Sequence, residues 1–292
     1  MIRTMENEFL RVQIEDKGAE LISIFDKEKN REIMWEADPA YWGRHAPVLF
    51  PNVGRHFGNT YTVGGNTYPS KQHGFARDSE FTPVRQTDSM IVHELKSSVE
   101  TKASYPFDFV FQAAHLLEGR ELTVAWTVFN ESEQTMYFTI GGHPAFRVPV
   151  LPGTDYSDYS LFFDSPDSLS YVLLDCPTGT TLGGQEKELV LKNGTLPLDT
   201  HLFDNDALVF DRGQIARVGI LLPDGTPHLE LRCQGFPSFG IWSVPGAPFV
   251  CLEPWMGRCD DYGYEGTLEE KPGINSIEPG KVFEKSYVIK IY

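Results

Sequence analysis

Two polar side chains of this 292-residue chain stand in apolar surroundings that suit them to proton transfer. Glu253 ends the apolar run Phe-Val-Cys-Leu-Glu and is followed by Pro254. A carboxylate rarely enters such a context without a partner or a purpose, and burial there would raise its pKa toward general-base work. His143 lies in Ile-Gly-Gly-His-Pro-Ala-Phe, where the following proline favours extended backbone. An imidazole, with an ordinary pKa of about 6.5, exchanges protons at neutral pH.

Two further candidates, Arg55 and His73, lie earlier in the chain. Arg55 closes the run Pro-Val-Leu-Phe-Pro-Asn-Val-Gly-Arg, and His73 lies in Gln-His-Gly-Phe-Ala-Arg. Each also has a purely structural interpretation, as a surface ion pair for Arg55 and as a packed turn for His73. Trp255 could hold the C–H face of a sugar or belong to the core. Together these residues, with neither metal-ligand spacing nor a nucleophile, indicate acid/base chemistry on a neutral polyhydroxylated molecule.

Several standard sites are absent from the sequence. It contains no H-E-x-x-H, no G-x-x-x-x-G-K-[ST] and no G-x-G-x-x-G. The segment 235–240 resembles a nucleophile elbow only superficially, since its spacing is wrong, so Ser238 is interpreted as structural. The four cysteines lie far apart, without a C-x-x-C pair, and are expected to be reduced thiols. Neither a cofactor nor a metal is therefore indicated.

The elements that must position these residues are predicted to be strands. Glycine and proline recur along the chain, and the segments between them are short and rich in Val, Ile, Phe, Tyr and Thr. Within 121–130, apolar and smaller residues alternate with a period of two, which is typical of a half-buried strand. A strand at 282–292 is expected to close the sheet, and Asp38 could cap a brief helix. We therefore predict one all-β domain over 1–292, a large antiparallel sandwich.

Charge and composition narrow the possible partners. The 41 acidic and 25 basic residues give a net charge of −16, which disfavours nucleic acid and anionic membrane surfaces. No stretch approaches the length of a membrane span. The amino-terminal residues carry charges where a secretory signal needs an apolar run, so a cytoplasmic location is expected.

Five motifs, in this order, resemble the aldose 1-epimerase (galactose mutarotase) family, in its LacX-like branch: P-V-L-F-P-N-V-G-R at 47–55, H-G-F-A-R at 73–77, G-G-H-P-A-F at 141–146, N-D-A-L-V-F at 205–210 and C-L-E-P-W at 251–255. The resemblance implies a β-supersandwich, no cofactor, and interconversion of the α and β anomers of a free aldose.

The same resemblance implies roles for individual residues. The family's catalytic glutamate corresponds to Glu253, its acid histidine to His143 and its second histidine to His73. Its sugar-binding arginine corresponds to Arg55. An aspartate that holds sugar hydroxyls should be Asp206 or, failing that, Asp204. His-Pro replaces the His-Thr often seen at 143, so hydroxyl specificity is expected to differ.

Other functions remain open from the sequence. A hexose 6-phosphate substrate would need a basic pocket, for which Arg44, Lys71 and Arg77 are available. A non-catalytic sugar-binding or sensor protein would use the same cleft. A glycoside hydrolase would need a second carboxylate opposite Glu253. The oligomeric state is left as monomer or homodimer.

Overall fold

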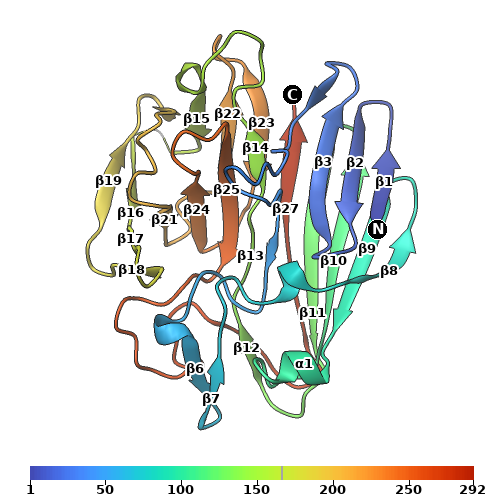
Figure 1. Cartoon of the computed structure of the whole chain (residues 1–292), viewed down its shortest axis with the longest axis vertical. Coiled ribbons are helices and arrows are strands. Elements are labelled where there is room, and N and C mark those ends of the chain that lie inside the picture. Colours follow the sequence, from blue (N-terminus) through green and yellow to red (C-terminus); the bar gives the residue numbers. More distant parts are fainter. Residues whose placement is uncertain (166) are drawn as a thin grey trace.

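The computed structural model describes residues 1–165 and 167–292, which form two large antiparallel sheets around a common core (Figure 1). The larger sheet has nine strands in the order β20 (Thr195–Pro197), β15 (Ser160–Phe163), β22 (Arg217–Leu221), β23 (Pro227–Arg232), β27 (Val282–Ile291), β11 (Glu121–Asn130), β10 (Phe109–Glu118), β9 (Met90–Lys96) and β8 (Thr82–Gln86). The main core cluster draws side chains from both sheets, such as Val124 of β11 and Val250 of the second sheet. The predicted all-β architecture is confirmed.

The second sheet has six strands and contains most of the sequence motifs. Its order is β21 (Leu208–Phe210), β24 (Ser238–Trp242), β25 (Phe249–Met256), β13 (Ile140–Gly142) and β5 (Val48–Leu49), with β14 (Ala145–Arg147) also paired to β25. Strand β25 lies in the middle of this sheet and is buried over seven of its eight residues. A strand buried on both faces must be apolar throughout, which makes the carboxylate of Glu253 in its interior an exception.

Smaller elements surround the two sheets. A four-stranded sheet is formed by β1 (Ile2–Glu6), β2 (Leu10–Glu15), β3 (Glu20–Asp26) and β4 (Arg31–Glu32). Two-stranded pairs are β6 (Thr60–Val63) with β7 (Asn66–Pro69), β12 (Met136–Phe138) with β26 (Asn275–Ile277), β16 (Ser168–Tyr171) with β19 (Lys187–Val190), and β17 (Leu174–Asp175) with β18 (Thr180–Thr181). The helical segments are α1 (Val99–Lys102) and the 3-10 turns η1 (Phe57–Asn59), η2 (Ala76–Asp78) and η3 (Tyr156–Asp158). In the described residues, no helix is long and apolar enough to cross a membrane.

Two local expectations differ from the structure. The carboxy-terminal strand β27 forms as predicted, but it lies inside the nine-stranded sheet between β23 and β11 and does not close it. The segment after Asp38 makes only a turn, in which the Asp38 carboxylate accepts the N–H of Ala40 at 2.9 Å, and then continues without regular structure to β5. By contrast, β11 spans the predicted residues, and its alternate side chains are buried.

Candidate active site

Strand pairing places His143 directly opposite Glu253. Gly141 of β13 pairs with Trp255, and Ala145 of β14 pairs with Cys251, both on β25. Both pairs belong to one register, so position 143 between the two strand segments faces position 253. Directly opposite residues of antiparallel strands project to the same side of the sheet. The two side chains therefore meet although 110 positions separate them in the sequence.

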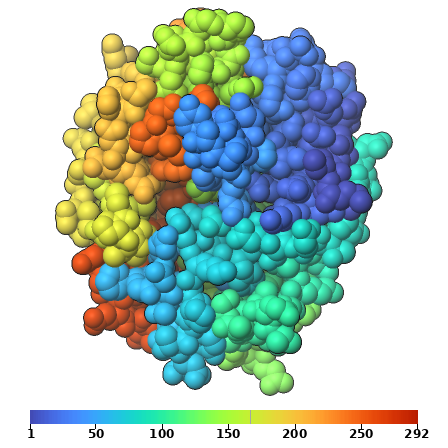
Figure 2. All heavy atoms as spheres, viewed as in Figure 1, coloured from blue at the N-terminus to red at the C-terminus, as the bar shows by residue number. Residues whose placement is uncertain are grey.

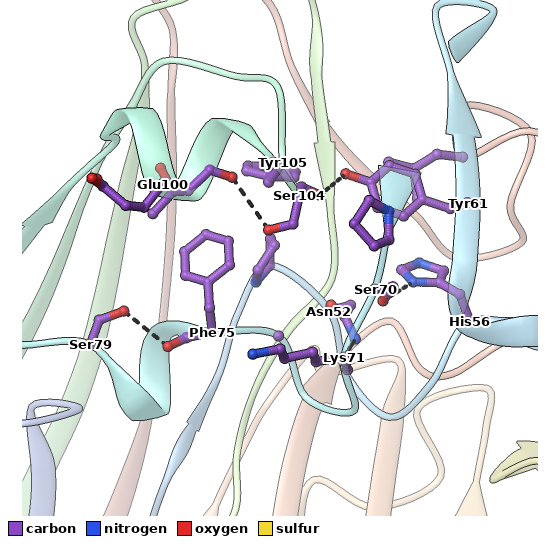
Figure 3. Close-up of a pocket in the computed structure, with 15 residues that line it drawn as sticks. Asn52, His56, Tyr61, Ser70, Lys71, Phe75, Ser79, Glu100, Ser104 and Tyr105 are labelled. Carbon is purple, nitrogen blue, oxygen red and sulfur yellow. Dashed lines mark hydrogen bonds between the residues drawn. The ribbon is translucent and has the colours of Figure 1, made fainter. Parts of the chain in front are cut away.

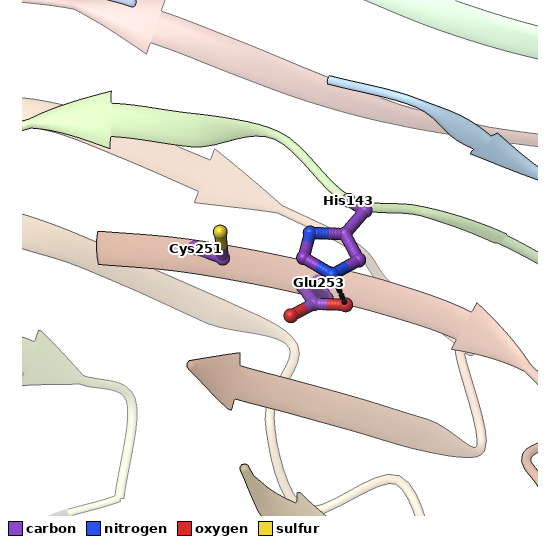
Figure 4. A group of neighbouring side chains, drawn as sticks. All are labelled: His143, Cys251 and Glu253. Carbon is purple, nitrogen blue, oxygen red and sulfur yellow. Dashed lines mark ion pairs between the residues drawn. The ribbon is translucent and has the colours of Figure 1, made fainter. Parts of the chain in front are cut away.

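His143 and Glu253 form a buried pair whose hydrogen bonding is incomplete. His143 Nε2 lies 3.3 Å from Glu253 Oε2, and the side chains point toward each other (Figure 4). His143 is 7% exposed and Glu253 is 1% exposed. Among the described residues, neither Glu253 Oε2 nor His143 Nδ1 has a hydrogen-bond partner. Buried polar atoms are normally satisfied, so these atoms stand ready for a ligand.

Burial moves both groups toward their neutral forms. It raises the pKa of Glu253 well above its usual range, and the negative charge of Asp206 adds to the rise. The Trp255 N–H opposes this rise in the pKa of Glu253, although its geometry falls short of a hydrogen bond. Burial also lowers the pKa of His143 to about 3. The uncharged carboxyl of Glu253 and the uncharged imidazole of His143 are therefore favoured by burial at this pair.

His73 lies beside His143, on a turn that is hydrogen-bonded to the segment after β5. Its backbone is in the left-handed region, with φ of 64°. Its N–H donates to the Gly54 carbonyl at 2.8 Å, and the Gly54 N–H donates to His73 Nδ1 at 3.0 Å. Because Nδ1 accepts a hydrogen bond, the neutral ring carries its proton on Nε2. The His73 and His143 ring centroids are 5.6 Å apart, and burial lowers the pKa of His73 well below its usual range.

Trp255 is packed between two glycines on the neighbouring strands. A Cβ at Gly141 or at Gly240 would come within 2.4 Å of the indole, so only glycine leaves the ring its space. Trp255 is 5% exposed, and its N–H has no hydrogen-bond partner in the part of the chain described. The expected sugar platform is therefore mostly buried, and the indole offers a ligand its N–H group instead of an open ring face.

Arg55 lies near His73 and Asp206 lies near Glu253, whereas Asp204 is engaged elsewhere. The Arg55 guanidinium donates to two neutral amides, Asn59 Oδ1 at 3.0 Å and Gln72 Oε1 at 3.3 Å, and its charge lowers the pKa of His73. Asp206 precedes β21 with φ of 68° and is close enough to raise the pKa of Glu253. Asp204 Oδ2 instead pairs with the exposed His201 at 2.9 Å. Of the two aspartates, the geometry favours Asp206.

Two of the three basic candidates also approach the histidines. Arg44 and Arg77 both lower the pKa of His143 after the larger effect of burial. Arg44 forms an ion pair with Asp78 at 2.8 Å, whereas Arg77 donates to the Gln72 carbonyl and keeps a buried Nε without a partner among the described residues. Figure 2 shows the chain around 70–77 bordering a hollow in which the deeper residues of the second sheet are visible.

Lys71 instead lines a separate cavity of about 270 Å³, between the β6–β7 hairpin, α1 and the segment that carries His73 (Figure 3). Its walls are mostly apolar, with Tyr61, Phe75 and Tyr105 as the largest rings. It contains none of the predicted catalytic or sugar-binding residues. This cavity is therefore distinct from the place where His143 meets Glu253.

Aromatic side chains surround His143, and the sequence analysis missed them. Trp42 stacks on its imidazole with ring centroids 4.8 Å apart, and Trp242 meets it edge-on at 5.7 Å. With Phe249 they belong to a small apolar cluster separate from the main core. No local pattern marks Trp42, because its partner lies about a hundred residues further along the chain.

One donor set near the pair has the composition of a metal site. Ligand atoms of His143, Cys251 and Glu253 lie within 4.8 Å of one another. Burial raises the pKa of the Cys251 thiol as well as that of Glu253. Both groups would have to lose a proton before binding a cation, so the arrangement is better suited to moving protons than to holding a metal.

The fold of this chain is that of the galactose mutarotase-like proteins. A crystal structure of a galactose mutarotase related enzyme from Lactobacillus acidophilus superposes with a TM-score of 0.95 and 34% identity, over 100% of this chain and 97% of that one. A galactose mutarotase-like protein from Lactobacillus casei ATCC 334 gives a TM-score of 0.91 and 29% identity, with complete coverage of both chains.

The chain belongs to the aldose 1-epimerase family, whose sequence model matches residues 1–289. It is also 33% identical over 295 residues to the chromosomal protein LacX of Lactococcus lactis subsp. lactis, with 98% of both chains covered. The resemblance drawn from the five motifs is thereby confirmed.

Proposed function

We propose that the protein is an aldose 1-epimerase that interconverts the α and β anomers of a free hexose. The observation that carries this proposal is the separation of 3.3 Å between His143 Nε2 and Glu253 Oε2. The anomeric hydroxyl and the ring oxygen of an aldose are bonded to the same carbon, so an acid and a base that serve them must be close neighbours. A dry site strengthens the interactions of both groups with the sugar.

In the proposed reaction, Glu253 takes the proton of the anomeric hydroxyl while His143 protonates the ring oxygen. The bond between the anomeric carbon and the ring oxygen breaks, and the free aldehyde forms. Rotation about the bond from the first to the second carbon, followed by closure, gives the other anomer. The pair gains one proton from the anomeric hydroxyl and gives one to the ring oxygen, so its number of protons is the same before and after ring opening. When the sugar's hydroxyls bind the unpartnered oxygen of Glu253 and favour its charged form, the carboxyl proton would pass to His143 Nε2, 3.3 Å away, which gives a carboxylate base and an imidazolium acid.

The other residues would hold the sugar in place. His73 presents its Nε2–H and would donate near the ring oxygen. Asp206 and Arg55 would bind hydroxyls, with Arg55 free to add a charged hydrogen bond because its present acceptors are neutral amides. Trp255 would donate its unpartnered N–H.

The test is the rate of anomer exchange, followed by NMR or polarimetry over a panel of hexoses. Glu253→Gln and His143→Asn should each slow the catalysed exchange, and unchanged rates in both variants would overturn the proposal. Calorimetry separates the alternatives, because a sugar-binding or sensor protein would bind hexose without accelerating exchange. Methyl glycosides, which lack a free anomeric hydroxyl, should be inert, whereas a hydrolase would release reducing sugar from them.

A hexose 6-phosphate is the second candidate substrate, and the positions of Arg44 and Arg77 favour it. Their charges reach His73 and His143 even though the chain carries a net charge of −16. The comparison is turnover of glucose against that of glucose 6-phosphate in the wild type and in Arg77→Met. A phosphate preference lost in Arg77→Met but kept in Lys71→Met would support this candidate, and a preference for the neutral sugar would exclude it.

A further inference from the structure

Trp42 covers His143 from a segment that belongs to neither sheet. Residues 36–46, here called the Trp42 segment, run without helix or strand between β4 and β5. The indole of Trp42 stacks on the imidazole with an interplanar angle of 26°. It also lies nearly parallel to the ring of Phe249, with centroids 5.8 Å apart. The partly buried Trp42 therefore ties a catalytic candidate to the apolar cluster beside it.

Two hydrogen bonds hold the backbone of Trp42, one to its carbonyl and one from its N–H. The Trp35 indole N–H donates to the Trp42 carbonyl at 2.9 Å, and the Trp42 N–H donates to the Asp38 carbonyl at the same distance. The Trp35 ring is itself tilted against Phe249 with centroids 4.9 Å apart. These contacts fix the position of the Trp42 ring before any sugar arrives.

A second ring constrains the imidazole from another direction. Trp242 of β24 meets His143 at an interplanar angle of 84° and also meets Trp42 edge-on at 5.5 Å. A face contact and an edge contact together leave the imidazole little freedom to rotate about its χ angles. Its Nε2 is thus held toward Glu253.

We propose that Trp42 is a positioning residue, which holds the imidazole of His143 toward Glu253 and excludes water from it. This inference rests on the proposed epimerase reaction, in which His143 is the acid. Removing the indole should let water reach His143 and let its ring turn. A displacement of a catalytic group by about 1 Å can lower the reaction rate by up to roughly 100-fold.

Other groups also act on the titration of His143 and must stay constant in the test. The titratable and charged groups that face it or reach it by charge are Glu253, Cys251, His73, Arg77 and Arg44. None of them belongs to the set of side chains that stack with Trp42. Arg44 belongs to the Trp42 segment itself, two residues from Trp42, whereas the other four groups lie outside that segment.

The first measurement is an NMR titration of the His143 imidazole in the whole protein without sugar. Wild type should show no His143 transition above about pH 4, because burial lowers its pKa to about 3. In Trp42→Ala and Trp42→Leu the midpoint should rise by about one pH unit or more as water solvates the charged form. Trp42→Phe, which keeps a stacked ring, should stay near wild type. An unchanged midpoint in both Trp42→Ala and Trp42→Leu would overturn the proposal.

The second measurement separates positioning from general packing. Trp42→Ala should lower kcat by about 10- to 100-fold with little change in KM, because an acid is displaced and no sugar contact is lost. Tyr41→Ala removes an exposed ring from the same segment and should leave kcat within about twofold. Equal losses in both variants would show that only the segment's packing matters, and would overturn the proposal. If wild type shows no epimerase activity, the proposed function fails, but the titration still decides whether Trp42 shields His143.

Discussion

Among the described residues, the buried pairs His93–Asp16 and His143–Glu253 differ in what else reaches the carboxylate. In the first pair, Nε2 of His93 in β9 lies 3.0 Å from Oδ1 of Asp16, which directly follows β2. Arg3 donates to both oxygens of Asp16, at 2.6 and 3.0 Å. In the second sheet, Glu253 has no such cation within ion-pair distance among the described residues, and His143 lies 3.3 Å away.

The permanent cation decides the protonation of each carboxylate. Burial alone would raise the pKa of Asp16, but the hydrogen bonds from Arg3 and His93 lower it below its ordinary value. The pKa of Glu253 rises because burial is not offset by a positive charge. A histidine and a carboxylate thus make a fixed structural pair in one place and a pair able to exchange its proton in the other.

The largest expected difference between the two pairs is in activity, when each carboxyl group is replaced by its amide. Glu253→Gln should lower kcat for anomer exchange by about 10²- to 10⁴-fold, the usual contribution of one general acid or base. Asp16→Asn should leave kcat within about twofold. A loss of similar size in a folded Asp16→Asn protein would remove the distinction between the two pairs.

In stability, by contrast, Asp16→Asn should cost more than Glu253→Gln. Asp16→Asn leaves Arg3 without its carboxylate and should lower the free energy of unfolding by about 1–2 kcal/mol. Glu253→Gln should be neutral or slightly stabilising, since it replaces an acid whose Oε2 has no partner. Urea unfolding at pH 7 measures both changes, and greater destabilisation by Glu253→Gln would contradict the assignment of roles.

The pH dependence of stability should have opposite signs at the two sites. Folding raises the pKa of Glu253, so its contribution to stability is complete below the ordinary pKa of 4.5 and is lost as pH rises toward the raised value. Asp16 contributes fully above its ordinary pKa of 3.8, and this contribution is lost as pH falls toward the lowered value. From pH 5 to 8, Glu253→Gln should therefore gain stability relative to wild type. A constant difference between the two proteins over this range would contradict the raised pKa.

A smaller effect is expected from the aspartate that acts on Glu253. Asp206→Asn removes a negative charge, so the pKa of Glu253 should fall and the acidic limb of the pH–rate profile should move to lower pH. KM should rise by several fold, up to about 10-fold, if the carboxylate binds a hydroxyl. Asp204→Asn is the matched control and should change neither quantity. A shift in the Asp204 variant alone would reverse the choice between them.

Much of the fold was predictable because its signals are local. The alternation in 121–130 needs only a half-buried environment, and β11 has the expected bounds. The place of β27 within the sheet was not predictable, because it depends on pairing with β23 and β11. The same limit applies to β25, whose central position follows from pairing with β24, β13 and β14.

In the candidate site too, local features were predictable from the sequence, and contacts between distant segments were not. Glu253 and His143 could be singled out because a polar residue in an apolar run is visible locally. Their distance could not be predicted, since it follows from the register of strands far apart in the chain. Spacing could not separate Asp206 from Asp204, because the left-handed backbone at Asp206 and the pairing of Asp204 with His201 are tertiary features.

The pairing that sets His143 against Glu253 also makes activity a local probe of unfolding. The pairing of β13 and β14 with β25 brings positions 143 and 253 together. Any partial opening that separates these strands abolishes the site while the nine-stranded sheet can remain intact. Inactivation in denaturant should therefore precede or coincide with the loss of overall structure. The difference in denaturant concentration between the activity curve and the unfolding curve would measure how far the second sheet opens independently.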